Sequence, residues 1–132
     1  MKLKDLGNAQ YIALETYRRN GEGVITPVWV VEEAGRLYVI TEGNSWKVKR
    51  IRNNKRVRVC QSDARGKPES DWIEAQARIL QGPDDMERQI QRISTKYAAQ
   101  IQSISLREQA ATRVVVEISS LSHRPKLLQA AK

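Results

Sequence analysis

The sequence predicts a small, mainly β protein in which six antiparallel strands close into a barrel beside one short and one long helix. Its 132 residues suit a single domain, residues 1–132, with one core. Short β-branched or alternating segments separated by turn residues indicate strands joined by hairpins. Apolar residues that recur every three or four positions after Pro83 indicate the long helix. Closing the sheet would remove its exposed edges.

The first three strands are expected at residues 11–17, 24–31 and 36–41, after an N-terminal short helix or arm. Asn20-Gly21 favours a tight turn because both residue types tolerate positive φ. The second strand is rich in β-branched residues. Short connections of this kind predict a β-meander, in which each strand pairs with the next.

A short helix should follow the third strand, from Ser45 to about Asn53. Ser45 is a suitable N-cap, and Val48 and Ile51 lie three apart on one face. The remaining strands are expected at residues 56–61, 72–80 and 112–118. The long helix carries an apolar stripe, which indicates a core or dimer face, formed by Met86, Ile90, Ile93, Tyr97, Ile101 and Ile104.

The net charge of +8 is compatible with nucleic acid, acidic lipid or a phosphorylated small ligand as partner. Seven of the twelve residues from position 47 to position 58 are Lys or Arg. Cys60 and His123 are the only residues of their types, so no disulfide or Cys- or His-rich metal site is expected. No signal peptide or membrane-spanning run is evident, so a cytoplasmic protein without membrane contact is expected.

The basic stretch begins with residues suited to hold one anion. Lys47 would occupy the second helical position, where a cation opposes the helix dipole unless an anion binds there. The Ser45 hydroxyl, the free N–H groups and the Thr41 hydroxyl at the preceding strand end could join it, with Lys49 and Arg50 one turn on. Converging donors suit a compact phosphate better than an extended polyanion. The alternative is a solvated helix face.

Pro27 marks an edge strand or a bulge, because proline cannot donate to a sheet ladder. A strand that leaves ladder positions open can present backbone groups to a ligand. Trp29 lies two residues on, toward the same side, and a flat ring could lie against this segment. The alternative is an ordinary edge strand with a tryptophan in the core.

Several segments together resemble the pyridoxamine-phosphate-oxidase-like flavin and deazaflavin oxidoreductases, and within them the probable deazaflavin (coenzyme F-420)-dependent branch. The resemblance is dense over residues 11–80. Its segments are Thr16-Tyr-Arg-Arg-Asn-Gly21, Thr26-Pro-Val-Trp-Val30, Leu37-Tyr-Val-Ile-Thr41, Lys47-Val-Lys-Arg50 and Arg56-Val57. The C-terminal Trp and Arg pattern of true pyridoxamine-phosphate oxidases is not matched, so vitamin B6 oxidation is not expected.

The resemblance implies a six- to seven-stranded antiparallel split β-barrel, the FMN-binding split barrel, as a homodimer with cofactor sites at the subunit interface. Relatives hold the cofactor phosphate at positions that correspond here to Thr41, Ser45, Lys47, Lys49 and Arg50. They lay the flavin or deazaflavin ring along the strand that corresponds to Thr26, Pro27, Val28 and Trp29. Lys47→Ala and Lys49→Ala are each expected to weaken cofactor binding.

The implied function is hydride transfer from reduced deazaflavin or FMN to a small organic acceptor, with the cofactor supplying the redox chemistry. No catalytic side chain is singled out, since Tyr11, Tyr17 and Tyr38 could each donate a proton and nothing selects among them. An alternative is a carrier that binds the cofactor, or haem, without turnover. Nucleic-acid binding is a weaker alternative, because only Trp46 borders the basic stretch as a stacking residue.

Overall fold

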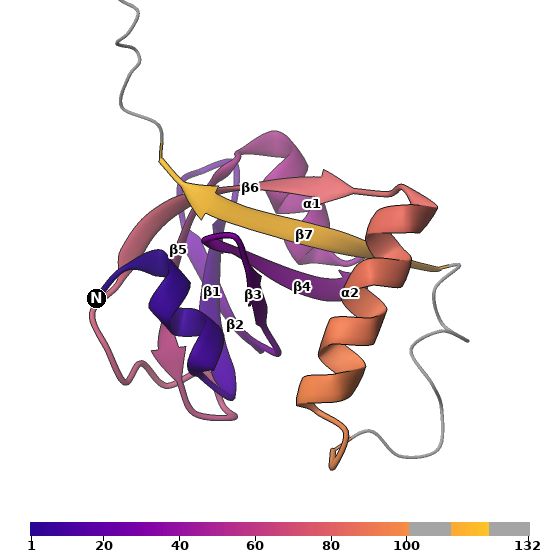
Figure 1. The fold of residues 1–132 in the computed structure, drawn as a ribbon. Coiled ribbons are helices and arrows are strands. Elements are labelled where there is room, and N and C mark those ends of the chain that lie inside the picture. The colour runs from indigo at the N-terminus through magenta and orange to yellow at the C-terminus, as the bar shows by residue number, and fades with distance from the viewer. Residues whose placement is uncertain (101–111, 122–132) are drawn as a thin grey trace, which may run out of the picture.

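A computed structural model describes residues 1–100 and 112–121 (Figure 1). The helices are the 3-10 helix η1 (Leu3–Asn8), α1 (Trp46–Asn53) and α2 (Pro83–Lys96). The strands are β1 (Tyr11–Tyr17), β2 (Gly23–Val28), β3 (Val31–Glu33), β4 (Arg36–Glu42), β5 (Arg56–Ser62), β6 (Ile73–Leu80) and β7 (Arg113–Ser120). The predicted strands other than the second are present with bounds shifted by at most two residues, and both predicted helices are present. The long helix α2 ends at Lys96, before Tyr97 of the predicted helical stripe, and residues 97–100 form a turn.

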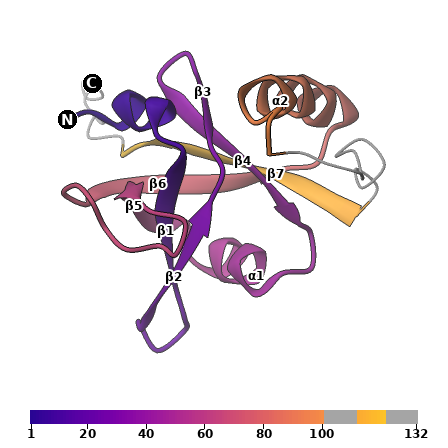
Figure 2. The ribbon, with the colours of Figure 1, turned by 90° about the horizontal axis from the view of Figure 1, so that it is seen from below.

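Within the described residues, the strands form one antiparallel sheet in the order β2-β1-β5-β6-β7-β4-β3. The two edge strands, β2 and β3, are consecutive in the chain. The sheet therefore curls until its edges approach, and the short Trp29–Val30 segment joins them (Figure 2). This curled half-barrel confirms the predicted split β-barrel class.

Two predictions about the second strand were wrong. Residues 24–31 do not form one strand, because β2 ends at Val28 and β3 begins at Val31. The first three predicted strands do not form a meander either, since β2 pairs only with β1 while β4 pairs with β3 and β7. The chain must change edges between β2 and β3, and Val30 donates its N–H to the Tyr97 hydroxyl, 2.9 Å away, instead of to a strand.

The main core lies inside the barrel. The inward-facing residues of β1, β4, β5, β6 and β7 pack there with Leu3 and Leu6 of η1 and Ile51 of α1. Their alternation along the strands is the pattern that the sequence shows. The helices η1 and α1 contribute these buried residues at separate places around the sheet, so they cover different parts of the barrel (Figure 2).

A second apolar cluster lies on the outer face of the sheet, where α2 packs against β3, β4 and β7. Met86, Ile90, Ile93 and Tyr97 of the predicted stripe are buried in this cluster, which confirms a core role for them. The last two residues of the stripe, Ile101 and Ile104, lie outside the described residues.

The end of α2 fastens the segment that joins the two sheet edges. The Lys96 ammonium donates to the carbonyl oxygens of Gly7 (2.9 Å), Ala9 (2.6 Å) and Val30 (2.7 Å). Burial lowers the pKa of Lys96. The fully buried Tyr97 ring stacks on Trp29, with centroids 4.4 Å apart and planes 6° from parallel. These contacts fix the segment between β2 and β3, where the two edges of the sheet approach each other.

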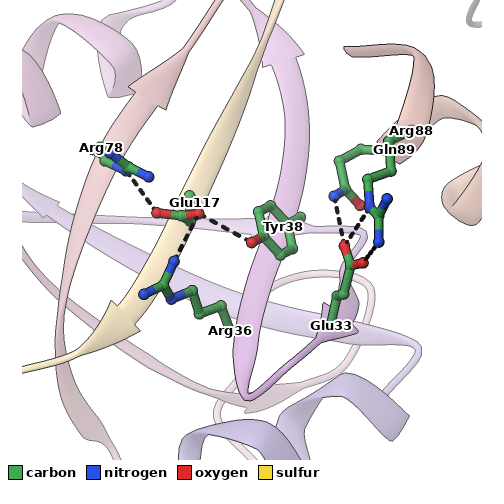
Figure 3. A network of polar contacts seen from close by, with 7 residues as sticks. All are labelled: Glu33, Arg36, Tyr38, Arg78, Arg88, Gln89 and Glu117. Atoms are coloured by element: carbon green, nitrogen blue, oxygen red, sulfur yellow. Dashed lines mark hydrogen bonds and ion pairs between the residues drawn. The ribbon is translucent and has the colours of Figure 1, made fainter. Parts of the chain in front are cut away.

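A buried carboxylate ties β4, β6 and β7 together on the outer face (Figure 3). Glu117 accepts hydrogen bonds from Arg78 Nε at 2.6 Å and from the Tyr38 hydroxyl at 3.0 Å, and it pairs with Arg36 at 3.5 Å. Burial alone would raise the pKa of Glu117, but the bonds from Arg78 and Tyr38 outweigh it and the pKa is lowered. A second carboxylate, Glu33, pairs with Arg88 of α2, which lowers its pKa to about 2.

Glu117→Gln is expected to reduce the free energy of unfolding at pH 7 by about 1–3 kcal/mol, since charge-assisted bonds to a buried group are lost. The folded-state pKa lies below the unfolded value, so this stabilisation is complete above about pH 4.5 and is lost as the pH falls. Chemical denaturation of the wild type and the variant at pH 7 and pH 3.5 measures the difference in their free energies of unfolding, and this difference should be smaller at pH 3.5. The control Glu74→Gln removes an exposed pair with Arg56 and should change stability by at most about 0.5 kcal/mol. A stability difference that does not change with pH would contradict a role for the Glu117 charge.

Candidate functional site

Helix α1 begins where the sequence predicts. Ser45 is its N-cap, and its Oγ accepts a hydrogen bond from the Val48 N–H at 3.4 Å. Val48 and Ile51 are buried, which fixes the helix face toward the barrel, where α1 packs against β1 and β6. The first turn of α1 contains no acidic residue that would satisfy its dipole.

Lys47 lies at this helix start beside the end of β4. Its ammonium donates to Thr41 Oγ1 at 3.1 Å, and Thr41 is buried. Burial lowers the pKa of Lys47, and the nearby cations Arg50 and Arg113 lower it further. No carboxylate in the described parts of the chain forms an ion pair with Lys47. A partly buried cation without a counterion, held by a hydroxyl at a helix N-terminus, is suited to receive an anion.

Arg113, the first residue of β7, was missed by the sequence analysis. It is the cross-strand partner of Glu42, the residue after Thr41. Its Nε is buried and has no hydrogen-bond partner in the part of the chain that the structure describes, and the nearest Glu42 oxygen is 3.9 Å away. A buried donor left unsatisfied costs about 1–3 kcal/mol. The only signal in the sequence was a cation at the start of a predicted strand, and the strand order that brings it beside β4 was not predictable.

Lys49 and Arg50 line a pocket that Lys47 does not reach, although Arg50 is close enough to Lys47 to lower its pKa. They line a pocket of about 630 Å³ with Tyr17, Arg18, Arg19, Asn20, Trp46 and Asn53, and neither Thr41 nor Lys47 lines it. This pocket, the hairpin pocket, lies between α1 and the β1–β2 turn, which projects past α1 in Figure 2. Arg50 Nε donates to the buried Thr16 hydroxyl at 2.7 Å. Lys49 lies over the exposed Trp46 ring, 4.4 Å from its centroid.

The four residues predicted to carry a cofactor ring lie at the split of the barrel. Thr26, Pro27 and Val28 belong to the edge strand β2, with Pro27 exposed, which confirms the edge position expected for proline. Trp29 lies beyond the end of β2, and one face of its ring is covered by Tyr97. Thr26 Oγ1 is buried without a hydrogen-bond partner. No described hydrogen bond or ion pair joins this segment to Thr41 or Lys47.

The tyrosines considered as proton donors differ in their surroundings. The Tyr17 hydroxyl donates to Glu15 Oε1 at 3.1 Å, and the Tyr38 hydroxyl donates to Glu117. Burial and these carboxylates raise the pKa of both phenols, so each proton is held where it lies. Cys60 is buried, which raises the pKa of its thiol and fits a structural role.

Other kinds of site find no support in the described residues. Across residues 1–100 and 112–121, no three His, Cys, Asp or Glu side chains gather in a way that could ligate a metal ion. None of the described helices is both long and apolar enough to cross a bilayer. His123 lies outside the described residues.

The sequence matches no protein-family model and no curated protein. Solved structures do match. A conserved hypothetical protein from Mycobacterium tuberculosis has a TM-score of 0.70 at 19% identity, covering 89% of this chain and 76% of its own. An F420 reductase has a TM-score of 0.64 at 17% identity, with coverages of 92% and 95%. A candidate pyridoxamine 5'-phosphate oxidase from Listeria innocua has a TM-score of 0.64 at 17% identity, with coverages of 89% and 88%.

At these low identities the matches show a shared fold, and the chemistry has to be argued from the residues of this chain. The seven-stranded curled sheet and its few helices match those neighbours over nearly nine-tenths of the chain. The protein therefore has the split β-barrel fold of the pyridoxamine-phosphate-oxidase-like proteins.

Proposed function

We propose that the protein is an oxidoreductase that uses a phosphorylated flavin-type cofactor, reduced deazaflavin (coenzyme F-420) or FMN, to reduce a small organic acceptor. The observation that carries this proposal is the Lys47 site. A partly buried ammonium, hydrogen-bonded to Thr41 and without a carboxylate partner in residues 1–100 and 112–121, lies at the start of a capped helix. The neighbouring folds named above include an F420 reductase, which supports the same cofactor class.

The residues present fit such a cofactor. Lys47, Thr41 and Ser45 would hold its phosphate through charge-assisted and neutral hydrogen bonds. The edge strand β2 would carry its ring, and the Thr26 hydroxyl, buried without a partner, would gain one from a polar atom of the ring. When bound, the cofactor would supply hydride transfer, while the chain binds and orients it and excludes water.

Among the described residues, no hydrogen bond or ion pair joins Thr41 or Lys47 to the segment of residues 26–29, and the resemblance implies a cofactor site between two subunits. We therefore propose a homodimer with the cofactor at its interface. Sedimentation should give a mass near twice 15.1 kDa. A monomer that binds cofactor at full affinity would contradict the shared site.

A carrier of the same cofactor, or of haem, requires no catalytic side chain and is separated from the reductase only by turnover. The test is to supply chemically reduced F-420 or FMN with a panel of quinone-like and unsaturated acceptors. The reductase predicts cofactor reoxidation that depends on both protein and acceptor. Tight binding without turnover would favour the carrier, and a Soret band after incubation with haem would favour haem.

The hairpin pocket favours a second candidate, the binding of a single-stranded nucleic acid. It is lined by four cations without a carboxylate among its lining residues, and Trp46, 71% exposed, offers a stacking face. Binding of this kind weakens steeply as salt is raised. Fluorescence anisotropy with labelled oligonucleotides at 50 and 200 mM salt tests it, and Trp46→Ala should abolish any stacking contribution.

A further inference from the structure

Arg113 is a cation with an unmet hydrogen-bonding demand close to the Lys47 site. Its side chain is 24% exposed, yet its Nε is buried without a partner, and Glu42 offers only an ion pair at 3.9 Å. Arg113 is also near enough to Lys47 to disfavour the charged form of that lysine. Two like charges therefore lie near the same end of β4, one contacting Thr41 and the other opposite Glu42, and nothing in the described residues neutralises Lys47.

An anion would stabilise these two neighbouring cations, because it would offset their repulsion and could accept a hydrogen bond from Arg113 Nε. A guanidinium binds phosphate oxygens through several parallel N–H groups, whereas an ammonium acts as a point charge, so the pair would be complementary. The third charge is the Glu42 carboxylate, which is 46% exposed and faces Arg113 across the strand pair. An incoming phosphate would compete with Glu42 for Arg113 and would be repelled by it.

We propose that Arg113 is a further phosphate-binding residue and that Glu42, its ion-pair partner, disfavours a second negative charge on the phosphate that the site accepts. This inference rests on the proposed function, because it describes the same phosphate site. It goes further by naming the property that would separate cofactors. FMN carries a phosphomonoester of charge close to −2 at neutral pH, and a phosphodiester carries −1.

The repulsion from Glu42 should grow in proportion to the charge on the phosphate, since Coulomb energy is a product of charges. Removing the Glu42 charge should thus favour a dianion by about twice as much, on a logarithmic scale, as a monoanion. An uncharged ligand should be unaffected. Three ligands with the same ring provide this series: riboflavin, its 5'-methyl phosphodiester, and FMN.

The experiment is fluorescence titration of the full-length protein with these three ligands at pH 7.5. Glu42→Gln is expected to tighten FMN binding about tenfold and diester binding about threefold, with riboflavin unchanged. Arg113→Gln is expected to weaken FMN binding at least about tenfold and to leave riboflavin unchanged. Arg113→Lys, which keeps the charge without the guanidinium, should give an intermediate loss.

The matched control is Arg56→Gln, which removes an equally charged side chain from an exposed pair with Glu74. It should change none of the three affinities by more than about twofold. Unchanged FMN affinity in Arg113→Gln, with wild-type binding intact, would overturn the role of Arg113 alone. Equal effects of Glu42→Gln on all three ligands would overturn the charge argument. Wild-type protein that binds FMN no better than riboflavin would overturn the phosphate site, and this proposal with it.

Discussion

Tyr97→Ala is expected to lower the free energy of unfolding by about 3–5 kcal/mol, the range for deleting a fully buried aromatic side chain. The loss combines three contributions. Removing the ring leaves a cavity in the outer apolar cluster and removes the stacking on Trp29. The hydroxyl donates to the Gln10 carbonyl at 2.8 Å and accepts from the Val30 N–H at 2.9 Å. Urea denaturation followed by tryptophan fluorescence measures the change.

Tyr97→Phe separates the hydroxyl from the ring. It should cost about 1–3 kcal/mol, because the buried Val30 N–H is left without an acceptor. The control is Tyr11→Phe, since the Tyr11 hydroxyl has no hydrogen-bond partner in the described residues, and its effect should stay within about 0.5 kcal/mol. Equal stability of Tyr97→Phe and the wild type would show that the hydroxyl does not fasten the junction between β2 and β3.

Lys47→Met is expected to weaken FMN or deazaflavin binding by about 1.5–3 kcal/mol, or about 10- to 150-fold in Kd. Methionine keeps most of the side-chain volume and removes the charge. Because burial and neighbouring cations already disfavour the Lys47 charge, the free protein should lose no stability. Isothermal titration with cofactor, together with denaturation of the apo variant, distinguishes lost binding from lost folding.

Lys49→Met provides the comparison. The sequence alone predicted an equal loss at Lys49, but the structure places that side chain over Trp46, in the hairpin pocket. We expect a loss of no more than about threefold there. An equal loss at both positions would mean that the cofactor reaches around the start of α1. Unchanged affinity in Lys47→Met would remove the assignment of the phosphate site.

Local patterns predicted the elements well because their causes are local. Strict alternation at Val57 and Val59 places β5, and the Ser45 cap with Val48 and Ile51 places α1. The contact between Lys47 and Thr41 was also predictable, since only a short turn separates the end of β4 from the helix.

Long-range features escaped the sequence analysis for the opposite reason. Where the chain changes sheet edges, at Trp29–Val30, the Val30 N–H donates to the hydroxyl of Tyr97, 67 residues later. Nothing near Trp29 signals this partner. Arg113 lies opposite Glu42 at the end of β4 only because β7 inserts between β6 and β4, an order that hairpin reasoning does not give. Helical periodicity alone turns Lys49 away from Lys47, but the hairpin pocket around Lys49 and Arg50 is completed by the β1–β2 turn, which is also distant in sequence.

The central claim is that the start of α1 binds a cofactor phosphate, and the most direct measurement is a pair of titrations of the wild-type protein with FMN and riboflavin. The two ligands differ only in the phosphate. The account predicts that FMN binds at least about tenfold more tightly, and that added inorganic phosphate at millimolar concentration reduces this advantage. Equal affinities for FMN and riboflavin would contradict the claim. So would a protein that binds none of FMN, riboflavin and deazaflavin.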